Sequence, residues 1–175
     1  MRNRSRIVAV AVDAFAAGEG DVTFDALARR AGVGVGTLYR NFPNRQALVE
    51  AVYRSELDDV VAQADALLAA HPADVALRRW IDRYAVFVAA KEGMAQAFRE
   101  AVASGVIAAT ETREAIRGAV ARFVAAGAVA GTLRGDVDAD DVTTALLSVV
   151  VGTAGTGTAQ RDRVLDIVVD GLRAR

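Results

Sequence analysis

The sequence contains no cysteine, a single histidine and only two prolines among its 175 residues. The absence of cysteine excludes disulfides, thiolate metal sites and cysteine nucleophiles. With His71 as the only histidine, neither a common zinc site nor a serine-histidine-aspartate triad can be assembled in the usual way. No carboxylate pair stands out in an apolar stretch. The sequence therefore gives no support for an enzyme, and it predicts no cofactor and no metal.

Long apolar runs are also missing. No stretch of about 18 uncharged apolar residues is present, so we expect no membrane span. Arg2, Arg4 and Arg6 precede an apolar run that imitates a signal peptide, but Asp13 interrupts it sooner than a signal sequence allows. Together with the lack of cysteine, this favours a cytoplasmic protein.

Net charge is small, −1 at pH 7, but it is unevenly distributed. Residues 1–50 carry seven arginines and five acidic residues, so their charge is +2 and that of the remainder is −3. A mildly basic head on an acidic body is compatible with DNA binding by the head. An apolar content of 53% and the scarcity of proline favour an all-α fold.

Apolar periodicity and helix breakers predict about nine helices and no strand. The expected helices cover residues 3–17, 24–31, 34–41, 45–70, 74–90, 94–103, 107–127, 139–152 and 160–173. Helix-capping oxygens are available on Asp21 or Thr23, Asn44, Asp74 and Asp138. The glycine-rich stretches 32–36 and 152–158 lack the preceding strand or the lysine of a phosphate-binding loop, so we interpret both as helix connections.

Residues 24–43 carry the strongest functional signal. Apolar residues at 24, 27, 28 and 31 form one face of a short helix, and Gly32 can adopt the left-handed conformation just past its end. A second short helix from Gly34 to Asn41 would be held by Leu38 and ended by Pro43. Such a pair is typical of a helix-turn-helix, whose second helix enters the DNA major groove. Similar helix pairs also occur in proteins that do not bind DNA.

The run from Ala28 to Val33, followed by Gly-Thr-Leu-Tyr-Arg-Asn-Phe-Pro at 36–43, resembles the N-terminal domain of the TetR family of transcriptional regulators. The resemblance covers roughly residues 5–53. It implies a three-helix DNA-binding domain over residues 1–46 and a helical effector-binding and dimerisation domain over residues 47–175. It also implies a cytoplasmic bacterial protein that is associated with the nucleoid when it is bound to DNA.

The residues expected to contact DNA lie on the second helix of the motif and at neighbouring helix starts. Arg40 is the best candidate because its guanidinium fork matches guanine or phosphate. TetR relatives often carry a small hydroxyl residue and a cation where this chain has Gly34 and Val35, and Val35 could meet a thymine methyl instead. Arg2, Arg4 and Arg6 either form a basic arm or are ordinary solvated surface. The DNA-contacting set is Thr23, Gly34, Val35, Thr37, Tyr39, Arg40, Asn41 and Arg45.

The resemblance also implies a ligand pocket and a dimer interface in the body. The candidate pocket residues, for which plain core packing is the alternative, are Trp80, Tyr84, Phe87, Met94, Phe98, Arg99, Arg113 and Phe123. The last two expected helices carry more apolar surface than one small domain needs, which suggests a partner surface. Its candidate residues are Val142, Leu146, Val149, Val150, Val164, Leu165, Val168 and Leu172.

These observations lead to one principal interpretation. The sequence predicts a homodimeric, TetR-like regulator, most often a repressor, that binds a double-stranded DNA operator and is released by a small, largely apolar effector. Two alternatives stay open. One is a helical small-molecule-binding protein or enzyme in which the helix-turn-helix is incidental, and the other is a protein–protein adaptor.

Overall fold

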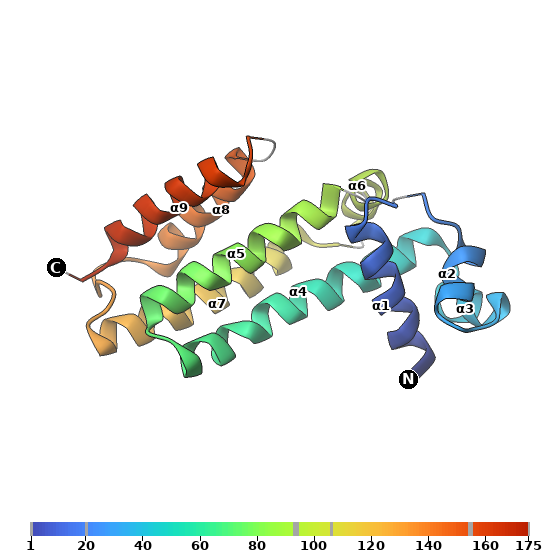
Figure 1. The fold of residues 1–175 in the computed structure, drawn as a ribbon, viewed down its shortest axis with the longest axis horizontal. Coiled ribbons are helices and arrows are strands. Elements are labelled where there is room, and N and C mark those ends of the chain that lie inside the picture. The colour runs from blue at the N-terminus through green and yellow to red at the C-terminus, as the bar shows by residue number, and fades with distance from the viewer. Residues whose placement is uncertain (1, 20, 93–94, 106, 154–155, 175) are drawn as a thin grey trace. The chain divides into compact units, whose positions relative to one another are not determined.

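The computed structural model describes residues 2–19, 21–92, 95–105, 107–153 and 156–174. Within these ranges the chain forms nine α-helices, and its only extended pairing is one antiparallel bridge between Leu133 and Arg173 (Figure 1). The predicted all-α fold is confirmed. The helices are α1 Arg2–Ala16, α2 Phe24–Arg30, α3 Val35–Asn41, α4 Arg45–Ala70, α5 Ala73–Glu92, α6 Ala95–Ala103, α7 Ala109–Ala130, α8 Ala139–Gly152 and α9 Thr158–Leu172. None of the described helices is long and apolar enough to cross a membrane.

The chain packs into two compact units. The first, here called the head unit, comprises Met1–Asp58 and Ala89–Ala109. The second, the body unit, comprises Asp59–Val88 and Thr110–Arg175. The grouping does not follow chain order, because α6 belongs with the first three helices although it follows α5 in the sequence.

In the head unit, α1, α2 and α3 turn their apolar stripes toward one another. Five apolar residues of α1 are buried, and they pack with residues of α2, α3 and the start of α4. The main members of this core are Ile7, Val8, Ala11, Ala14, Phe15, Leu27, Ala28, Leu38, Phe42, Leu48 and Val52. Since none of the three helices exceeds 15 residues, this shared core supplies most of their stability.

Three of the expected helix caps are formed. The Thr23 hydroxyl and the Asn44 carboxamide oxygen each accept a hydrogen bond from the backbone N–H three residues on, at 3.2 and 2.8 Å. The Asp138 carboxylate accepts one from the N–H two residues on, at 2.6 Å. The expected cap at Asp74 is not formed, because α5 already begins at Ala73 and the carboxylate lies in its first turn.

Trp80 contacts three helices of the body unit. Its side chain is fully buried, and the indole Nε1 donates a hydrogen bond of 2.8 Å to the backbone oxygen of Val60 on α4. The indole ring lies 5.7 Å from the Phe123 ring of α7 and 6.0 Å from the Tyr84 ring, centroid to centroid. This single side chain therefore ties α4, α5 and α7 together.

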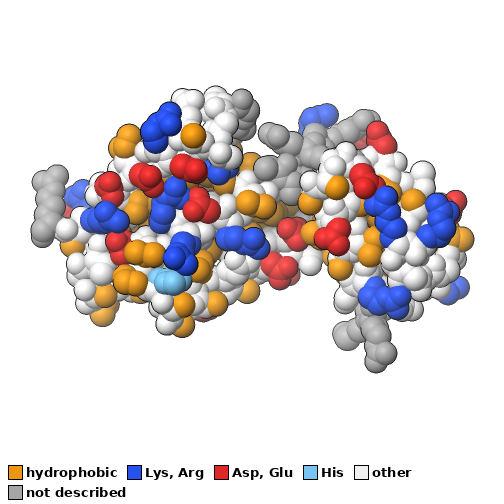
Figure 2. All heavy atoms as spheres, viewed as in Figure 1, with side chains coloured by type: hydrophobic (Ala, Val, Ile, Leu, Met, Phe, Trp, Pro, Cys, Tyr) orange, Lys and Arg blue, Asp and Glu red, His pale blue; other side chains and the backbone are white. Residues whose placement is uncertain are grey.

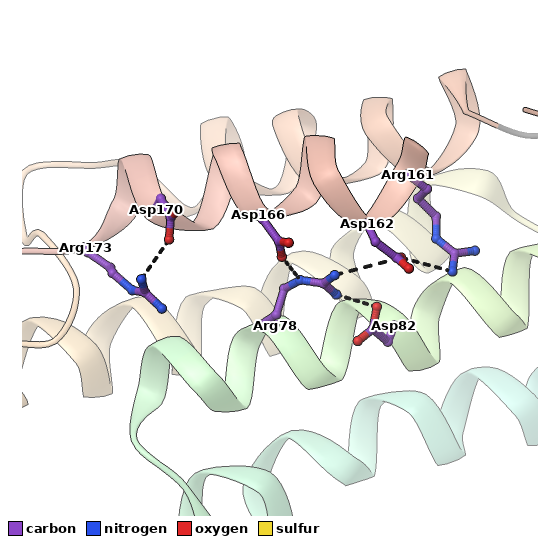
Figure 3. Close-up of polar contacts among 7 residues, drawn as sticks. All are labelled: Arg78, Asp82, Arg161, Asp162, Asp166, Asp170 and Arg173. Atoms are coloured by element: carbon purple, nitrogen blue, oxygen red, sulfur yellow. Dashed lines mark hydrogen bonds and ion pairs between the residues drawn. The ribbon is translucent and has the colours of Figure 1, made fainter. Parts of the chain in front are cut away.

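Acidic and basic side chains lie close together over α5 and α9 on the face shown in Figure 2. Arg78 of α5 stands among three carboxylates (Figure 3). It is bonded to Asp82 one turn along its own helix, and its Nε donates to Asp166 of α9 at 2.6 Å. Its Nη2 lies 3.8 Å from an oxygen of Asp162. Arg78 thereby joins α5 to two successive turns of α9.

Arg173 makes a second link between the same two helices. Its Nε donates to Asp74 of α5 at 3.1 Å, and its Nη1 donates to Asp170 at 2.8 Å. The carboxylate that was expected to cap α5 therefore holds the C-terminal end of α9 instead. Together, Arg78 and Arg173 fix the position of α9 along α5.

The pKa of Arg78 reflects this surrounding. Burial lowers it, but hydrogen bonds to Asp166 and Asp82, and the negative charges of both carboxylates, raise it by more, so the net shift is upward. A raised folded-state pKa stabilises the fold at every pH below the ordinary arginine value and loses that effect only above it. Arg78 is thus a permanent cation over the whole range in which the protein is usually handled.

We predict that Arg78→Met lowers the free energy of unfolding by about 1–2 kcal/mol, because the change leaves three clustered carboxylates without their shared cation. Chemical denaturation followed by circular dichroism measures this. Arg117→Met is the matched control, since Arg117 forms an ion pair with Glu114 on its own helix, and both side chains are exposed. An equal loss in both variants would contradict a special role for Arg78.

Candidate nucleic-acid interface

A tight turn joins α2 to α3. Gly32 has a φ of +61°, the left-handed conformation that follows a helix end and that residues with a side chain adopt at a cost. The N–H of Val33 returns to the carbonyl of Ala28 at 3.0 Å, and the Val33 side chain packs against the head core. The predicted helix-turn-helix is therefore present, with the turn placed at the expected glycine.

Arg6 of α1 closes this turn from outside. Its guanidinium donates hydrogen bonds to the carbonyls of Ala31 and Gly32, the second at 3.2 Å. These carbonyls lie at the C-terminal end of α2, where a cation is favoured by the helix dipole. Any other residue at position 32 would carry the backbone cost of the left-handed conformation. Its side chain would also clash with Arg6, because a Cβ there would lie 2.7 Å from Nη2.

The short helix α3 turns one side inward and presents the other to solvent. Leu38 is fully buried, and Phe42 directly after the helix is 1% exposed. Two hydrophobic residues of this helix are nevertheless exposed: Val35 is 42% exposed and Tyr39 is 52% exposed. Gly34, Gly36 and Arg40 are also exposed, whereas Thr37 and Asn41 are partly buried. The solvent-exposed side of α3 thus includes Val35, Tyr39 and Arg40.

Hydrogen bonds order the polar end of this face. Arg40 Nη2 donates to the Thr37 hydroxyl at 2.9 Å, and Asn41 Nδ2 donates to the Thr37 backbone oxygen at 2.7 Å. Both bonds span one turn of the helix. Arg40 therefore extends along the helix surface rather than freely into solvent, and its remaining N–H groups are available for an acceptor outside the chain.

Tyr39 packs α3 against the start of α2, next to Thr23. The Tyr39 ring lies 5.1 Å from the Phe24 ring, centroid to centroid, at an interplanar angle of 52°. Thr23 precedes Phe24 and uses its hydroxyl as the N-cap of α2. The tyrosine ring is therefore positioned by packing while half of its surface remains open.

Arg45 and Arg4 are used within the head unit itself. Arg45 Nη1 donates to the backbone oxygen of Val22 at 3.0 Å, and its guanidinium carbon lies 5.8 Å from the centre of the Phe15 ring. The guanidinium carbon of Arg4 lies 5.0 Å from the centre of the Phe42 ring. With Arg6 bound to the turn, two of the three arginines proposed as a basic arm have partners in the head, and the side chain of Arg2 lies outside the described residues.

Comparisons with known proteins identify this architecture. Residues 71–174 match the family model for the C-terminal domain of SbtR-like transcriptional regulators, and residues 7–52 match the model for bacterial regulatory proteins of the tetR family. The chain belongs to the TetR family of transcriptional regulators. DNA binding through the helix-turn-helix follows from the N-terminal TetR domain.

Solved structures agree with the family models. The chain is similar to the TetR transcriptional regulator SCO0520 from Streptomyces coelicolor, with 42% identity over 98% of each chain and a TM-score of 0.84. It is also similar to a TetR transcription regulatory protein from Mycobacterium vanbaalenii, with 37% identity over 99% of this chain and 96% of that one, and a TM-score of 0.76. No curated protein matched the sequence.

The structure brings together four of the eight pocket residues proposed for this TetR-family body. Trp80, Tyr84, Phe87 and Phe123 are at most 5% exposed and form one aromatic cluster of the body unit. Phe98 belongs to the head unit, where its ring lies 5.2 Å from that of Tyr53. Of the other candidates, Arg99 is exposed, Arg113 pairs with Asp140 at 2.9 Å on the surface, and Met94 lies outside the described residues.

The eight residues proposed for the dimer interface divide into two groups. Five are buried within the chain itself, namely Val142, Leu146, Val150, Leu165 and Leu172, while Val149, Val164 and Val168 are partly buried. Leu146 and Leu165 have no exposed surface, so a charge at either position would disrupt the subunit's own core before it affected a partner. Neither residue is a suitable probe of dimerisation.

Sequence reasoning missed the more exposed apolar residues of the same two helices. Ile167 on α9 is 70% exposed and Val151 on α8 is 62% exposed. Ile167 follows the partly buried Val164 by three residues, a spacing that places both on one side of the helix, and it directly precedes the partly buried Val168. The available signal was the apolar stripe on these helices, which is longer than the core can cover. The stripe does not show which of its residues face inward and which face outward.

We predict that Arg6→Ala lowers the free energy of unfolding by about 1 kcal/mol, because two carbonyls at the end of α2 lose a charged donor. The midpoint of chemical denaturation measures the change. Arg29→Ala provides the control, since Arg29 is an exposed arginine on α2 itself, and we expect its effect to stay within about 0.5 kcal/mol. Indistinguishable midpoints for the two variants would show that Arg6 does not hold the turn.

Proposed function

We propose that this TetR-family regulator is a homodimeric repressor whose α3 helices enter the major grooves of a near-palindromic operator. The observation that supports this proposal is the exposed face of α3. This face includes Val35, Tyr39 and Arg40, and the helix is anchored by the buried Leu38. A helix fixed on one side and open on the other can enter a groove without disturbing its own fold.

Each DNA-facing residue has a role in this proposal. Arg40 donates to guanine or phosphate, the Tyr39 hydroxyl reaches phosphate, and Thr37 contacts a base edge or phosphate. Thr23 and Asn41 contribute secondary polar contacts near the groove wall. Arg45 supports the site mainly by holding the start of α4 to the loop between α1 and α2, since one of its nitrogens is already bonded to Val22.

Dimerisation is proposed through α8 and α9, which pack against each other and are drawn side by side in Figure 1. Val151 and Ile167 are more than half exposed on these helices, and the partly buried Val149, Val164 and Val168 lie beside them in sequence. Exposed apolar residues of this kind favour a second copy as a partner. Two copies would present two α3 helices to half-sites about one helical turn of DNA apart.

The effector is proposed to be a small, largely apolar molecule bound by the body, within residues 47–175, while residues 1–46 serve as the DNA-binding domain. The buried aromatic cluster around Trp80 supports this chemistry because aromatic rings line many small-molecule sites. Such a ligand releases DNA only when it binds the DNA-incompetent form more tightly than the competent one. Thermal-shift screening of metabolites would detect it as a rise in melting temperature.

DNA binding itself is tested by selecting bound duplexes from a random double-stranded library with the full-length protein. We expect enrichment of a near-palindromic site, and an affinity for it that falls steeply as salt rises, because phosphate contacts release counterions. A library that yields no enriched sequence over several rounds would contradict the proposal.

We predict that Arg40→Ala weakens binding to the selected site by about tenfold or more, because a bidentate base or phosphate contact is lost. Gel shifts or fluorescence anisotropy measure the affinity, and size-exclusion chromatography confirms an unchanged oligomer. Arg117→Ala removes the same charge from an exposed position on α7 in the body unit and should leave the affinity unaltered. Equal affinities for wild type and Arg40→Ala would exclude Arg40 from the contact.

We predict that Ile167→Glu converts the dimer to monomers, because it places a charge on the exposed apolar surface of α9 without entering the subunit core. Sedimentation velocity measures the state. Val129→Glu is the control, since Val129 is 92% exposed on α7 and carries the same substitution. A dimer that persists in the Ile167→Glu variant, with helix content unchanged, would place the interface elsewhere.

A further inference from the structure

The first two residues of α3, Val35 and Gly36, carry no polar side chain. The helix follows Gly34 as the N-cap, and no side chain caps it there. Val35 follows at 42% exposure, and Gly36 comes next, also exposed. The hydrogen-bonding residues of the helix, Thr37 and Arg40, lie further along. The outward face is therefore apolar at its N-terminal end and polar toward its C-terminal end.

No contact among the described residues requires glycine on either side of Val35. A Cβ built on Gly34 or Gly36 meets no atom of the described residues within 4 Å. Neither glycine has a positive φ, and Gly34 lies at −69°. Glycine also weakens a helix relative to alanine. Glycine at positions 34 and 36 therefore brings no benefit to the folded chain. Gly32 differs, because its positive φ shapes the turn.

Val35 itself contributes little to the core. The inward position of this helix is filled by Leu38, which is fully buried. Val35 instead presents a branched, apolar side chain that can neither donate nor accept a hydrogen bond. In the major groove, the C5 methyl of thymine is the apolar group that a base edge offers to such a side chain.

Resting on the function proposed above, we infer that Val35 is a specificity-determining residue that contacts the C5 methyl of one thymine in each operator half-site. Valine is short, so this contact requires the helix backbone to come close to the base edges. The bare surfaces of Gly34 and Gly36 permit that approach. One end of α3 reads a methyl group, and the other reads hydrogen-bonding groups through Arg40 and Thr37.

The test replaces single thymines by deoxyuridine in the duplex selected from the random library. This change removes the methyl and keeps every base-pairing group. At one position of each half-site we expect the wild-type affinity to fall about fourfold per half-site, the value of one buried methyl group. Anisotropy titrations with the full-length protein measure it.

The Val35→Ala variant tests whether residue 35 is the group that contacts the methyl. This variant should bind the thymine and the deoxyuridine duplexes with equal affinity, whereas Val129→Ala, the same change at an exposed position of α7, should keep the wild-type difference. A wild type that is indifferent to deoxyuridine at every thymine overturns the inference while leaving DNA binding intact. A methyl dependence that persists in Val35→Ala also overturns it, because another group must then read the methyl. Failure to select any duplex overturns the proposed function and this inference together.

The role of the glycines beside Val35 is tested with a second variant, Gly36→Ala, and its control, Gly118→Ala. Gly36→Ala should raise the melting temperature yet weaken binding to the selected duplex, since its new methyl lies between the helix and the groove. Gly118→Ala in α7, where a Cβ also meets no described atom within 4 Å, should raise the melting temperature with unchanged DNA affinity. If Gly36→Ala binds as tightly as wild type, close approach is not needed and this part of the inference is overturned.

Discussion

The burial of Leu38 in the head core is the contact on which the exposed face of α3 depends. Helix α3 has only seven residues and includes Gly36, so it could not persist in water alone. Leu38 is fully buried among residues of α1, α2 and α4, and Phe42 closes the far end of the helix at 1% exposure. With these two positions fixed, the helical period decides that Val35, Tyr39 and Arg40 face outward.

The turn at Gly32 supplies the second constraint. Leu38 can reach the core only if the chain reverses within the residues between α2 and α3, and this reversal uses the left-handed conformation of Gly32. Arg6 neutralises the carbonyl end of α2 at the same point. The orientation of α3 is therefore set by one buried leucine, one glycine and one arginine from a helix that does not belong to the motif itself.

Local chemistry explains what could be predicted from the sequence. Thr23, Asn44 and Asp138 were expected as caps because a cap bonds to an N–H two or three residues away, and all three do so. Gly32 was expected as a helix stop for the same local reason. The helix pattern and the TetR-like run were enough to predict the fold and the family.

Long-range partners could not be predicted in this way. Arg6 binds carbonyls 25 and 26 residues away, and Arg78 binds Asp166 at a separation of 88 residues. An arginine has the same appearance in a sequence whether it faces solvent, a phosphate or a distant carboxylate. Asp74 shows the same ambiguity, since it pairs with Arg173 rather than capping its helix. Only folding decides among these partners, because each choice depends on which helices pack together.

The exposed fraction of a side chain distinguishes residues that look alike in the apolar pattern of the sequence. Leu165 and Ile167 are two residues apart on α9, yet the first has no exposed surface and the second is 70% exposed. Both are apolar, and a broad apolar stripe contains both. Apolar residues in excess of the core become informative only after the core is known, since those left outside it define the surface that another molecule can cover. The same reasoning applies to Val35, whose exposure beside two unconstrained glycines is unexplained by the folded chain and consistent with close contact to a groove.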